Sequence, residues 1–227
     1  GEYIQESTLG EIGVKFDLFD GQFYSALAAF DQEKTYRDSQ TNALVAVFGQ
    51  GIEFEARALI SDNLSLLATA THSDTSEVSN GALAIINSAD FAAQNGLEPW
   101  EVYGGRIAGD RVNFVGENVE LDRGGLPDNI FSAYATWFTP TSNGDFTANF
   151  GFTWVDETYT DIFETILLPS YTIWNGSVSY SFGDFTALAQ VNNILDEEYY
   201  TSADLFDSVV VKPSEGRTIS LTLSYRN

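Results

Sequence analysis

Hydrophobic and polar residues alternate regularly in the last part of the chain. In residues 218–225, isoleucine, leucine or tyrosine occupies every second position, and threonine or serine occupies the positions between them. Successive side chains of a strand point to opposite faces of a sheet, so this run predicts a strand with one apolar and one polar face. Residues 171–182 and 185–191 repeat the pattern around Gly183-Asp184, which predicts a hairpin.

The length of these runs separates two kinds of sheet. They hold 8, 12 and 7 residues, close to or above the roughly nine to eleven that a tilted strand needs to cross a bilayer. Strands of globular proteins usually hold about five or six residues. The length therefore favours an all-β, membrane-spanning sheet.

The same alternation predicts about nine strands along the chain. Between them we expect a loop at residues 1–10 and a short helix at residues 88–94, with Ser88 as its N-cap and Gly96 beyond its end. Residues 43–48 fit either a strand tip or a loop segment. The strands before the last three are expected at residues 11–18, 22–33, 51–60, 64–71, 129–138 and 146–155.

Short and long connections alternate between the expected strands. An antiparallel up-and-down meander would place all short turns at one end and all long loops at the other, as in outer-membrane β-barrels. The short connections are residues 20–21, 61–63, 139–145 and 183–184. The long ones are residues 34–50, 74–128, 156–169 and 194–215.

Composition narrows the function classes. The chain has 227 residues with 33 acidic and 10 basic side chains, so no basic patch is available for nucleic acid. It has no cysteine, which excludes a disulfide framework and a cysteine nucleophile. Its apolar runs are far shorter than the ~18 residues of a transmembrane helix. Because it lacks an initiator methionine and a signal segment, we expect a processed chain or a fragment.

The sequence contains no recognisable catalytic or cofactor site. His72 is the only histidine, so a histidine triad or a multi-histidine metal site cannot form. An acidic group could bind calcium through carboxylate oxygens, but its spacing matches no known loop, and a solvated acidic loop is expected. This group is Asp196, Glu197, Glu198, Asp204 and Asp207.

Two sets of residues are candidates for a functional surface. Glu53 and Glu55 share one face of a predicted strand with Arg57, and we interpret them as a polar lumen wall rather than an acid–base pair. The long 74–128 connection combines aromatic stacking surfaces with guanidinium groups that bind anions. Its ligand-binding candidates are Trp100, Tyr103, Arg106 and Arg111.

Several stretches, taken together and in order, resemble a known family. They are residues 10–19 with Gly21, residues 29–31, residues 51–55, residues 126–128, residues 168–171, residues 190–200 and Gly216-Arg217. The most specific is the Asn-Asn-x-Leu-Asp-x-x-Tyr-Tyr segment from Asn192 to Tyr200, followed by the Gly-Arg pair. The set resembles the C-terminal barrel portion of the TonB-dependent outer-membrane receptors. Such chains usually end on an aromatic residue, whereas here Arg226 and Asn227 follow Tyr225.

The resemblance implies a fold and a function. It implies a transmembrane β-barrel of 22 strands, of which this chain, residues 1–227, would supply the last nine. It also implies a Gram-negative outer membrane and active uptake of a scarce extracellular solute, foremost an iron–siderophore complex, with cobalamin, haem or an oligosaccharide as alternatives. The implied partners are membrane lipid, the remaining strands, and TonB acting through an N-terminal plug; neither the plug nor those strands has a counterpart here. Asn192, Asn193, Tyr199 and Tyr200 are expected to be structural.

Nine strands alone would leave two unpaired edges, which cannot lie in lipid. We therefore expect the missing strands outside this sequence, or one further strand at residues 1–5 or 43–48. Two other function classes remain open. One is a complete, passive small barrel, and the other is an acidic secreted β-sandwich that binds glycans through tryptophan and tyrosine.

Overall fold

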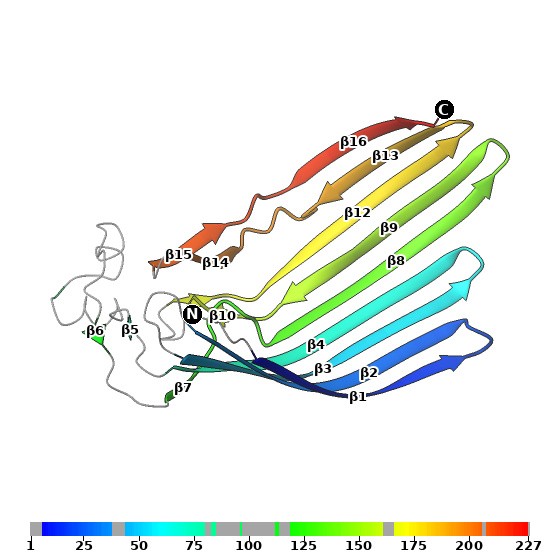
Figure 1. Ribbon diagram of the computed structural model, residues 1–227. Coiled ribbons are helices and arrows are strands. Elements are labelled where there is room, and N and C mark those ends of the chain that lie inside the picture. Colours follow the sequence, from blue (N-terminus) through cyan, green and yellow to red (C-terminus); the bar gives the residue numbers. More distant parts are fainter. Residues whose placement is uncertain are drawn as a thin grey trace.

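The computed structural model describes residues 6–37, 44–79, 83–84, 96, 112–113, 119–160, 166–205 and 208–226. Figure 1 shows that the long strands lie side by side in one curved sheet, with β1 at one edge and β16 at the other. No helix that could cross a membrane occurs in these parts of the chain.

The main sheet is an antiparallel meander with the order β1-β2-β3-β4-β8-β9-β12-β13-β16. Its strands are β1 (Glu6–Leu18), β2 (Phe23–Arg37), β3 (Leu44–Ser61), β4 (Leu64–Ser79), β8 (Asn129–Thr141), β9 (Gly144–Val155), β12 (Tyr171–Phe182), β13 (Phe185–Asn192) and β16 (Thr218–Tyr225). The predicted nine-strand meander is thus confirmed. The two edge strands do not pair with each other, so the sheet is open, as expected.

Short strands lie at the long-loop end of the main sheet. β7 (Val119–Asp122) pairs with the end of β4. Three two-stranded sheets complete the described structure: β5 (Leu83–Ala84) with β6 (Val112–Asn113), β10 (Thr158–Tyr159) with β11 (Leu167–Leu168), and β14 (Tyr200–Leu205) with β15 (Ser208–Pro213).

The strand register sorts the side chains onto two faces. Residues that are directly opposite in neighbouring strands point to the same side of a sheet. One row across the sheet reads Val14, Leu27, Phe54, Ala70, Phe131, Trp154 and Thr172. The next row reads Lys15, Ala26, Glu55, Thr69, Ser132, Thr153 and Ile173. From β12 to β13 and β16, Val178, Ala189 and Leu221 continue the apolar face, and Ser177, Gln190 and Ser220 continue the polar face. The alternation in the sequence therefore gives two faces that each continue over all nine strands.

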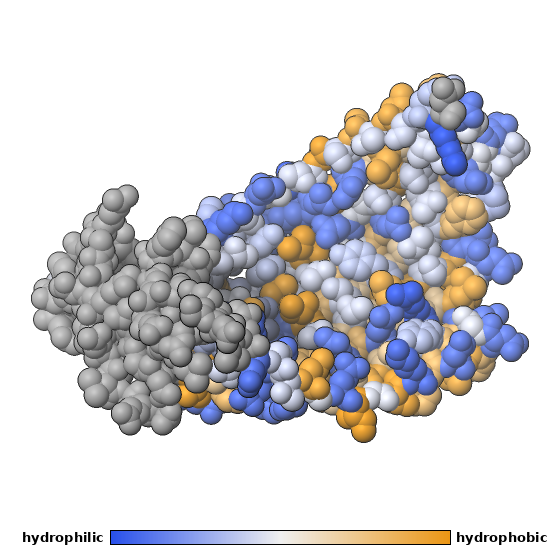
Figure 2. Space-filling model, in the orientation of Figure 1, coloured by the Kyte–Doolittle hydropathy of each residue, from blue (hydrophilic) through white to orange (hydrophobic). Residues whose placement is uncertain are grey.

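The apolar face is not covered by any other described part of the chain. Ile12 is 77% exposed and Leu221 is 82% exposed, and the only buried hydrophobic side chains among the described residues are Val45 and Leu168. A β-sandwich needs two sheets packed over a shared core. The β-sandwich interpretation is therefore wrong for this single-layered sheet. In Figure 2, hydrophilic and intermediate residues cover most of the hollowed face, and hydrophobic residues gather along the outer margin.

Aromatic rings form clusters on the apolar face. Near the short turns, the ring of Phe182 lies 5.7 Å from both Tyr180 and Phe185, and Phe185 lies 5.0 Å from Tyr225. A second cluster lies further toward the long loops and comprises Phe131, Phe150, Phe152 and Trp174. Barrels in outer membranes carry such girdles where the lipid meets water.

The short turns all lie at one end of the sheet, as predicted (Figure 1). In the first turn, Phe19 and Asp20 have φ angles of 58° and 54°, and Gly21 has 84°. The β8–β9 turn is tighter than expected, because Pro140 still pairs with Asp145.

The strands reach further toward the long loops than the sequence pattern predicts. β1 already begins at Glu6, and β2 and β3 pair from Phe23 and Ala58 out to Arg37 and Leu44. The predicted loop at residues 1–10 is therefore wrong for residues 6–10, and the predicted connection at residues 34–50 is wrong for residues 34–37 and 44–50; residues 1–5 and 38–43 lie outside the described residues. Residues 44–48 belong to β3 and do not form an extra strand. Toward the long loops, polar residues occupy the face that is apolar nearer the short turns; they are Asp31, Gln50 and Asp74. Hydrophobic and polar residues therefore no longer alternate in this part of the sequence. Backbone pairing needs no apolar surface and therefore continues beyond it.

The long connections also contain more structure than expected. β4 extends to Ser79 and β7 follows at Val119, so the 74–128 interruption is shorter at both ends. The acidic 156–169 segment contains the β10–β11 pair, and the 194–215 segment contains the β14–β15 hairpin. The predicted helix at residues 88–94 and the candidate strand at residues 1–5 lie outside the described residues.

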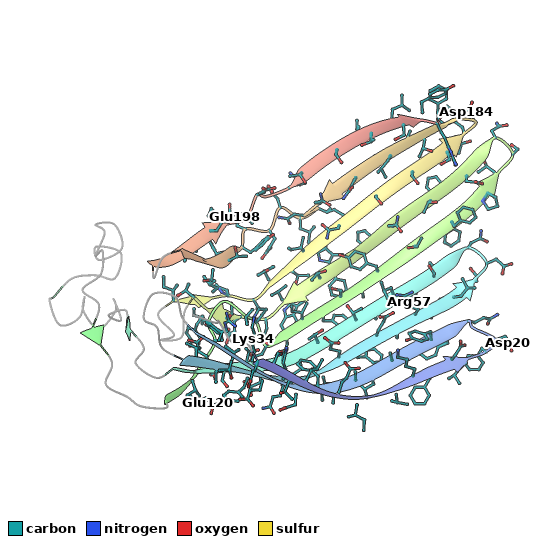
Figure 3. All side chains as sticks on the ribbon, in the orientation of Figure 1. Asp20, Lys34, Arg57, Glu120, Asp184 and Glu198 are labelled. Carbon is teal, nitrogen blue, oxygen red and sulfur yellow. The ribbon has the colours of Figure 1, made fainter. Side chains whose placement is uncertain are left out.

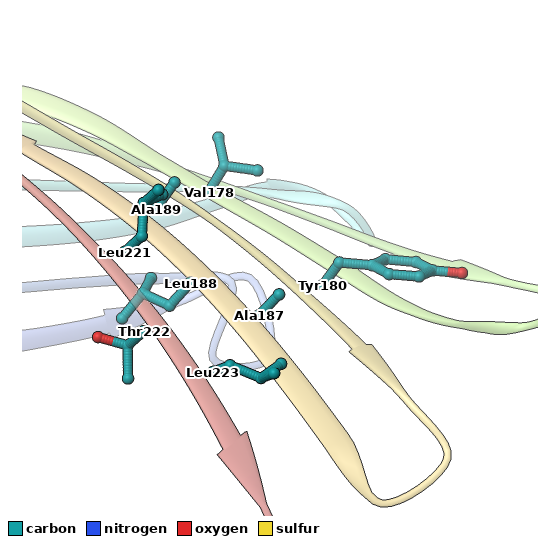
Figure 4. Close-up of a pocket in the computed structure, with 8 residues that line it drawn as sticks. All are labelled: Val178, Tyr180, Ala187, Leu188, Ala189, Leu221, Thr222 and Leu223. Atoms are coloured by element: carbon teal, nitrogen blue, oxygen red, sulfur yellow. The ribbon is translucent and has the colours of Figure 1, made fainter.

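A shallow groove of about 410 Å³ crosses the apolar face between β12 and β16. Figure 4 shows its lining residues, with Ala187 and Ala189 of the central strand β13 between longer side chains on both sides. The groove arises because alanine is short. Val178, Tyr180, Leu221 and Leu223 of the apolar face also line it, and it is bordered by Leu188 and Thr222, which the register assigns to the polar face.

On the polar face, the Tyr134 ring lies against Gly151 in the neighbouring strand. A Cβ added to Gly151 would collide with the backbone carbonyl oxygen of Ala133 and would lie 2.6 Å from Tyr134 Cγ, which is too close for the ring to stay in place. The Tyr134 hydroxyl is 3.2 Å from Thr153 Oγ1 and accepts a hydrogen bond of 3.3 Å from Asn175 Nδ2. Glycine therefore lets the ring lie flat and join three strands.

We expect Gly151→Ala to destabilise the native polypeptide by about 1–3 kcal/mol, because the added methyl collides with the Ala133 carbonyl oxygen and displaces the Tyr134 ring from its hydrogen bonds. The measurement is the midpoint of urea unfolding. Gly49→Ala is the matched control, since the nearest atom to its added Cβ is Thr75 Oγ1 at 3.9 Å. Equal shifts in the two variants would contradict the role of the ring.

Candidate functional site at the long-loop end

The predicted ligand-binding residues lie outside the described residues. Trp100, Tyr103, Arg106 and Arg111 therefore remain predictions. What the structure describes is the base of their connection: the Arg123 backbone N–H donates to Thr75 O at 2.8 Å, and the Ser73 N–H donates to Asp128 O at 2.8 Å. The chain thus returns to the sheet directly beside β4, the strand from which it left.

A hydrogen-bonded chain joins three strands at this base. His72 Nδ1 is 2.9 Å from Asn129 Oδ1, and Asn129 Nδ2 donates to Asp156 Oδ2 at 2.6 Å. His72 lies in the middle of β4 and contributes to this structural contact. The bonds link it to the first residue of β8 and to the residue that follows β9.

Acidic side chains surround this base. Burial raises the pKa of the Asp128 carboxyl above its ordinary value, and repulsion from Asp74, Asp122 and Asp156 raises it further, whereas His72 lowers it. On the neighbouring strands, Ser76 Oγ donates to Glu120 Oε1 at 2.5 Å. The base of the loop is therefore acidic.

A tight turn ends β13 and is built around Asn193. This residue is 4% exposed and has a φ of 53°. Its side-chain Nδ2 donates to Glu197 O at 2.9 Å, and its Oδ1 accepts from the Glu197 N–H at 2.9 Å. Its own N–H donates to Asn175 Oδ1 at 3.0 Å. Asn193 therefore has the structural role expected of the Asn-Asn pair.

Asp196 and Arg217 connect this turn to the start of β16. Asp196 Oδ1 accepts from the Arg217 N–H at 2.7 Å, and Arg217 Nη1 donates to Ile194 O at 3.2 Å. Gly216, with a φ of 71°, would bring an added Cβ 3.3 Å from Asp196 Oδ1. The sequence showed these motifs about 20 residues apart, but nothing in the spacing indicated that they bind each other.

The loop bases contact one another beyond this turn. Ser202 Oγ donates to Thr160 O at 2.8 Å, and the Gly125 N–H donates to Tyr159 O at 2.6 Å. The Tyr171 and Tyr199 rings stack at 4.1 Å. The segments before β8, between β9 and β12, and between β13 and β16 thus form one platform, which we call the loop platform.

The acidic group Asp196, Glu197, Glu198, Asp204 and Asp207 is only partly described by the structure. Asp196 is engaged by Arg217, and no cluster of three potential ligands occurs in the described part of the chain. Asp207 lies outside the described residues, as does the side chain of Asp204.

The structure brings together part of the predicted lumen wall. Arg57 Nε lies 2.7 Å from Glu55 Oε1, and the register places Glu53, Glu55 and Arg57 on the polar face of β3. Both partners of the ion pair are substantially exposed, so it contributes little to stability. That these residues line a lumen remains a prediction.

Comparison with known proteins gives one family and several similar folds. The family model described as "TonB dependent receptor-like, beta-barrel" matches residues 5–194. A search of curated proteins found no match.

Three solved structures have similar folds. The ferric yersiniabactin uptake receptor FyuA from Yersinia pestis is 14% identical with a TM-score of 0.67 over 96% of this chain and 29% of that one. The ferric preacinetobactin receptor BauA from Acinetobacter baumannii is 19% identical with a TM-score of 0.66, over 97% and 29%. The siderophore receptor PiuA from Acinetobacter baumannii is 18% identical with a TM-score of 0.67, over 96% and 28%. The chain therefore spans under a third of each of these proteins.

We expect Asn193→Ala to open the turn that ends β13. Losing the side-chain bonds leaves the Glu197 N–H and C=O without their partners, at a cost of about 2 kcal/mol, which corresponds to roughly 30-fold faster exchange of the Glu197 amide. Hydrogen exchange of the native polypeptide by mass spectrometry measures this.

Two further variants isolate the cause. Asn193→Gly tolerates the positive φ but lacks the side chain, so it should behave like Asn193→Ala. Asn192→Ala removes two exposed bonds, one to Thr218 and one from Gln190, neither of which involves Glu197, and should leave the Glu197 amide unchanged. Protection of that amide in Asn193→Gly would show that backbone conformation alone holds the turn.

Proposed function

Because this chain belongs to the TonB-dependent receptor family, within its β-barrel, we propose that it forms part of the wall of an outer-membrane receptor that takes up an iron–siderophore complex. One observation carries the proposal: a meander of membrane-spanning length has one continuous apolar face, one polar face and all its long loops at one end. Such a sheet suits lipid on one side and water on the other.

The proposed location is the outer membrane of a Gram-negative bacterium. The apolar face would contact lipid, and the short turns would face the periplasm, as in barrels of this kind. The open edges β1 and β16 would pair with further strands of the same barrel. An N-terminal plug in that barrel would transmit the action of TonB, and the chain would have no enzymatic role.

The proposed ligand follows from the named neighbours. FyuA is a ferric yersiniabactin uptake receptor, BauA a ferric preacinetobactin receptor and PiuA a siderophore receptor. The extracellular capture surface would combine the loop platform with the 74–128 connection. A passive small barrel is less well supported, because β1 and β16 do not pair to close the sheet.

We expect Val178→Arg to destabilise the receptor strongly, because Val178 lies near the middle of β12 on the apolar face. An arginine facing lipid near mid-membrane costs about 2–4 kcal/mol. The amount of folded receptor in outer membranes measures this. Ser179→Arg is the matched control on the polar face and should be tolerated. If both variants fold equally well, the apolar face does not contact lipid.

We expect Arg106→Ala and Arg111→Ala each to weaken ligand binding about tenfold or more, since a hydrogen bond to a charged group contributes about 1.5–3 kcal/mol. Arg57→Ala, in the wall, is the control and should keep the affinity. Tryptophan fluorescence of the purified full-length receptor, titrated with the ligand identified below, measures this. Unchanged affinity in both loop variants would remove these residues from the site.

The function itself is tested with the same purified receptor and a panel of ferric hydroxamate, ferric catecholate and ferric phenolate siderophores, cobalamin and haemin. Saturable binding of one ferric siderophore is the expected result. Binding of cobalamin or haemin without any siderophore would overturn the proposed ligand, and binding of none would overturn capture by these loops.

A further inference from the structure

The polar face of the sheet has two different halves. On β1, β2 and β3 it carries charges of both signs, and Figure 3 shows Lys34 and Arg57 among them. We call this half the charged wall. Its charged residues are Glu11, Lys15, Asp17, Lys34, Glu53, Glu55 and Arg57.

The other half is almost uncharged. Across β8, β9, β12, β13 and β16 the register gives the polar face a single charged side chain, Asp145, beside a short turn. We call this half the neutral wall. It is made largely of hydroxyl and amide side chains, among them Ser132, Thr136, Asn149, Thr153, Asn175, Ser177, Gln190, Asn192, Ser220 and Thr222.

Side chains of the neutral wall bond to each other from strand to strand. Thr136 Oγ1 donates to Asn149 Oδ1 at 2.7 Å, and Asn149 Nδ2 donates to Ser177 Oγ at 3.2 Å. Similar bonds occur near the short turns, where Ser181 Oγ is 3.0 Å from Thr186 Oγ1, and near the loops, where Ser132 Oγ is 2.9 Å from Thr153 Oγ1. The hydroxyl and amide groups of the neutral wall therefore satisfy part of one another's hydrogen-bonding capacity, from the short turns to the loop end.

Among the described residues, most charged side chains of the charged wall do not pair with each other. Its one ion pair in the described part of the chain is Arg57 with Glu55, and neither Lys15 nor Glu53 has one there. Complementary charges on two opposed surfaces select the partner and fix the register of one surface on the other. Neutral hydroxyl and amide groups exchange bonds with water or solute at little net cost, and a passage needs contacts weak enough to release what enters.

We propose that the neutral wall lines the water-filled passage through the receptor, whereas the charged wall is the side against which the N-terminal plug packs, its charges of both signs facing charges of the plug. This inference rests on the proposed function. The neutral wall also continues into the loop platform: Asn175 links Tyr134 of the wall to the turn at Asn193. A solute released from the platform would therefore meet hydroxyl and amide groups first.

Cysteine labelling tests this directly, since the chain has no cysteine of its own. Ser132→Cys and Ser177→Cys place thiols on the neutral wall, Ala26→Cys places one on the charged wall, and Ala189→Cys places one on the apolar face. Ala26 and Ser132 belong to the same row across the sheet, which makes them a matched pair. The full-length receptor in outer-membrane vesicles is treated with an uncharged, water-soluble maleimide, after any native cysteines elsewhere are replaced.

We expect both neutral-wall thiols to react at least about tenfold faster than Ala26→Cys and Ala189→Cys, because the reactive thiolate needs water. Equal or faster reaction of Ala26→Cys would overturn the proposal while leaving the membrane receptor intact. Unreactive thiols at both Ser132→Cys and Ser177→Cys would also overturn it. Fast reaction of Ala189→Cys would instead show that the apolar face does not meet lipid, which contradicts the proposed function itself. Heat-modified gel mobility confirms that each variant is folded.

Discussion

Backbone hydrogen bonding is the constraint on which this structure depends. A strand in lipid has no water to satisfy its N–H and C=O groups, so each must pair with a neighbouring strand. The antiparallel meander meets this requirement for every strand except on the outer sides of β1 and β16. Those two edges define where further strands of a barrel would join, and the sheet otherwise needs no core of its own.

The difference in side chains between the two faces follows from this backbone pairing. With backbone groups paired inside the sheet, side chains are free to match their surroundings, which gives apolar residues and aromatic girdles on one face and hydroxyl, amide and charged groups on the other. The polar face can then vary along the sheet without loss of the fold. Its change from charged to neutral between β3 and β8 is such a variation.

The loop end obeys a different rule. Beyond the apolar span the strands keep pairing but lose their alternation, and side-chain hydrogen bonds to the backbone order the chain there. Asn193 and Asp196 satisfy backbone groups of the turn and of the start of β16. Contacts such as Ser202 with Thr160 then join loops that are far apart in sequence. This makes a rigid base beneath the predicted capture loops.

The sequence by itself determined the strands within the apolar span, their faces and the ends at which the turns lie. Alternation is a local signal, because it reflects which face of one strand meets an apolar environment. It therefore placed Glu55 and Arg57 on one face and predicted the β12–β13 hairpin correctly. It also indicated that the sheet would stay open.

Only the tertiary structure decided the rest. The extensions of β2 and β3 to Arg37 and Leu44 have no alternation to reveal them, since both of their faces lie outside the apolar span. The bond between Asp196 and the Arg217 N–H joins residues 21 apart in the chain, and the neutral wall appears only once five strands are set in register. These features depend on which strands become neighbours. Backbone hydrogen bonding across the sheet determines the neighbours, and the local sequence pattern does not.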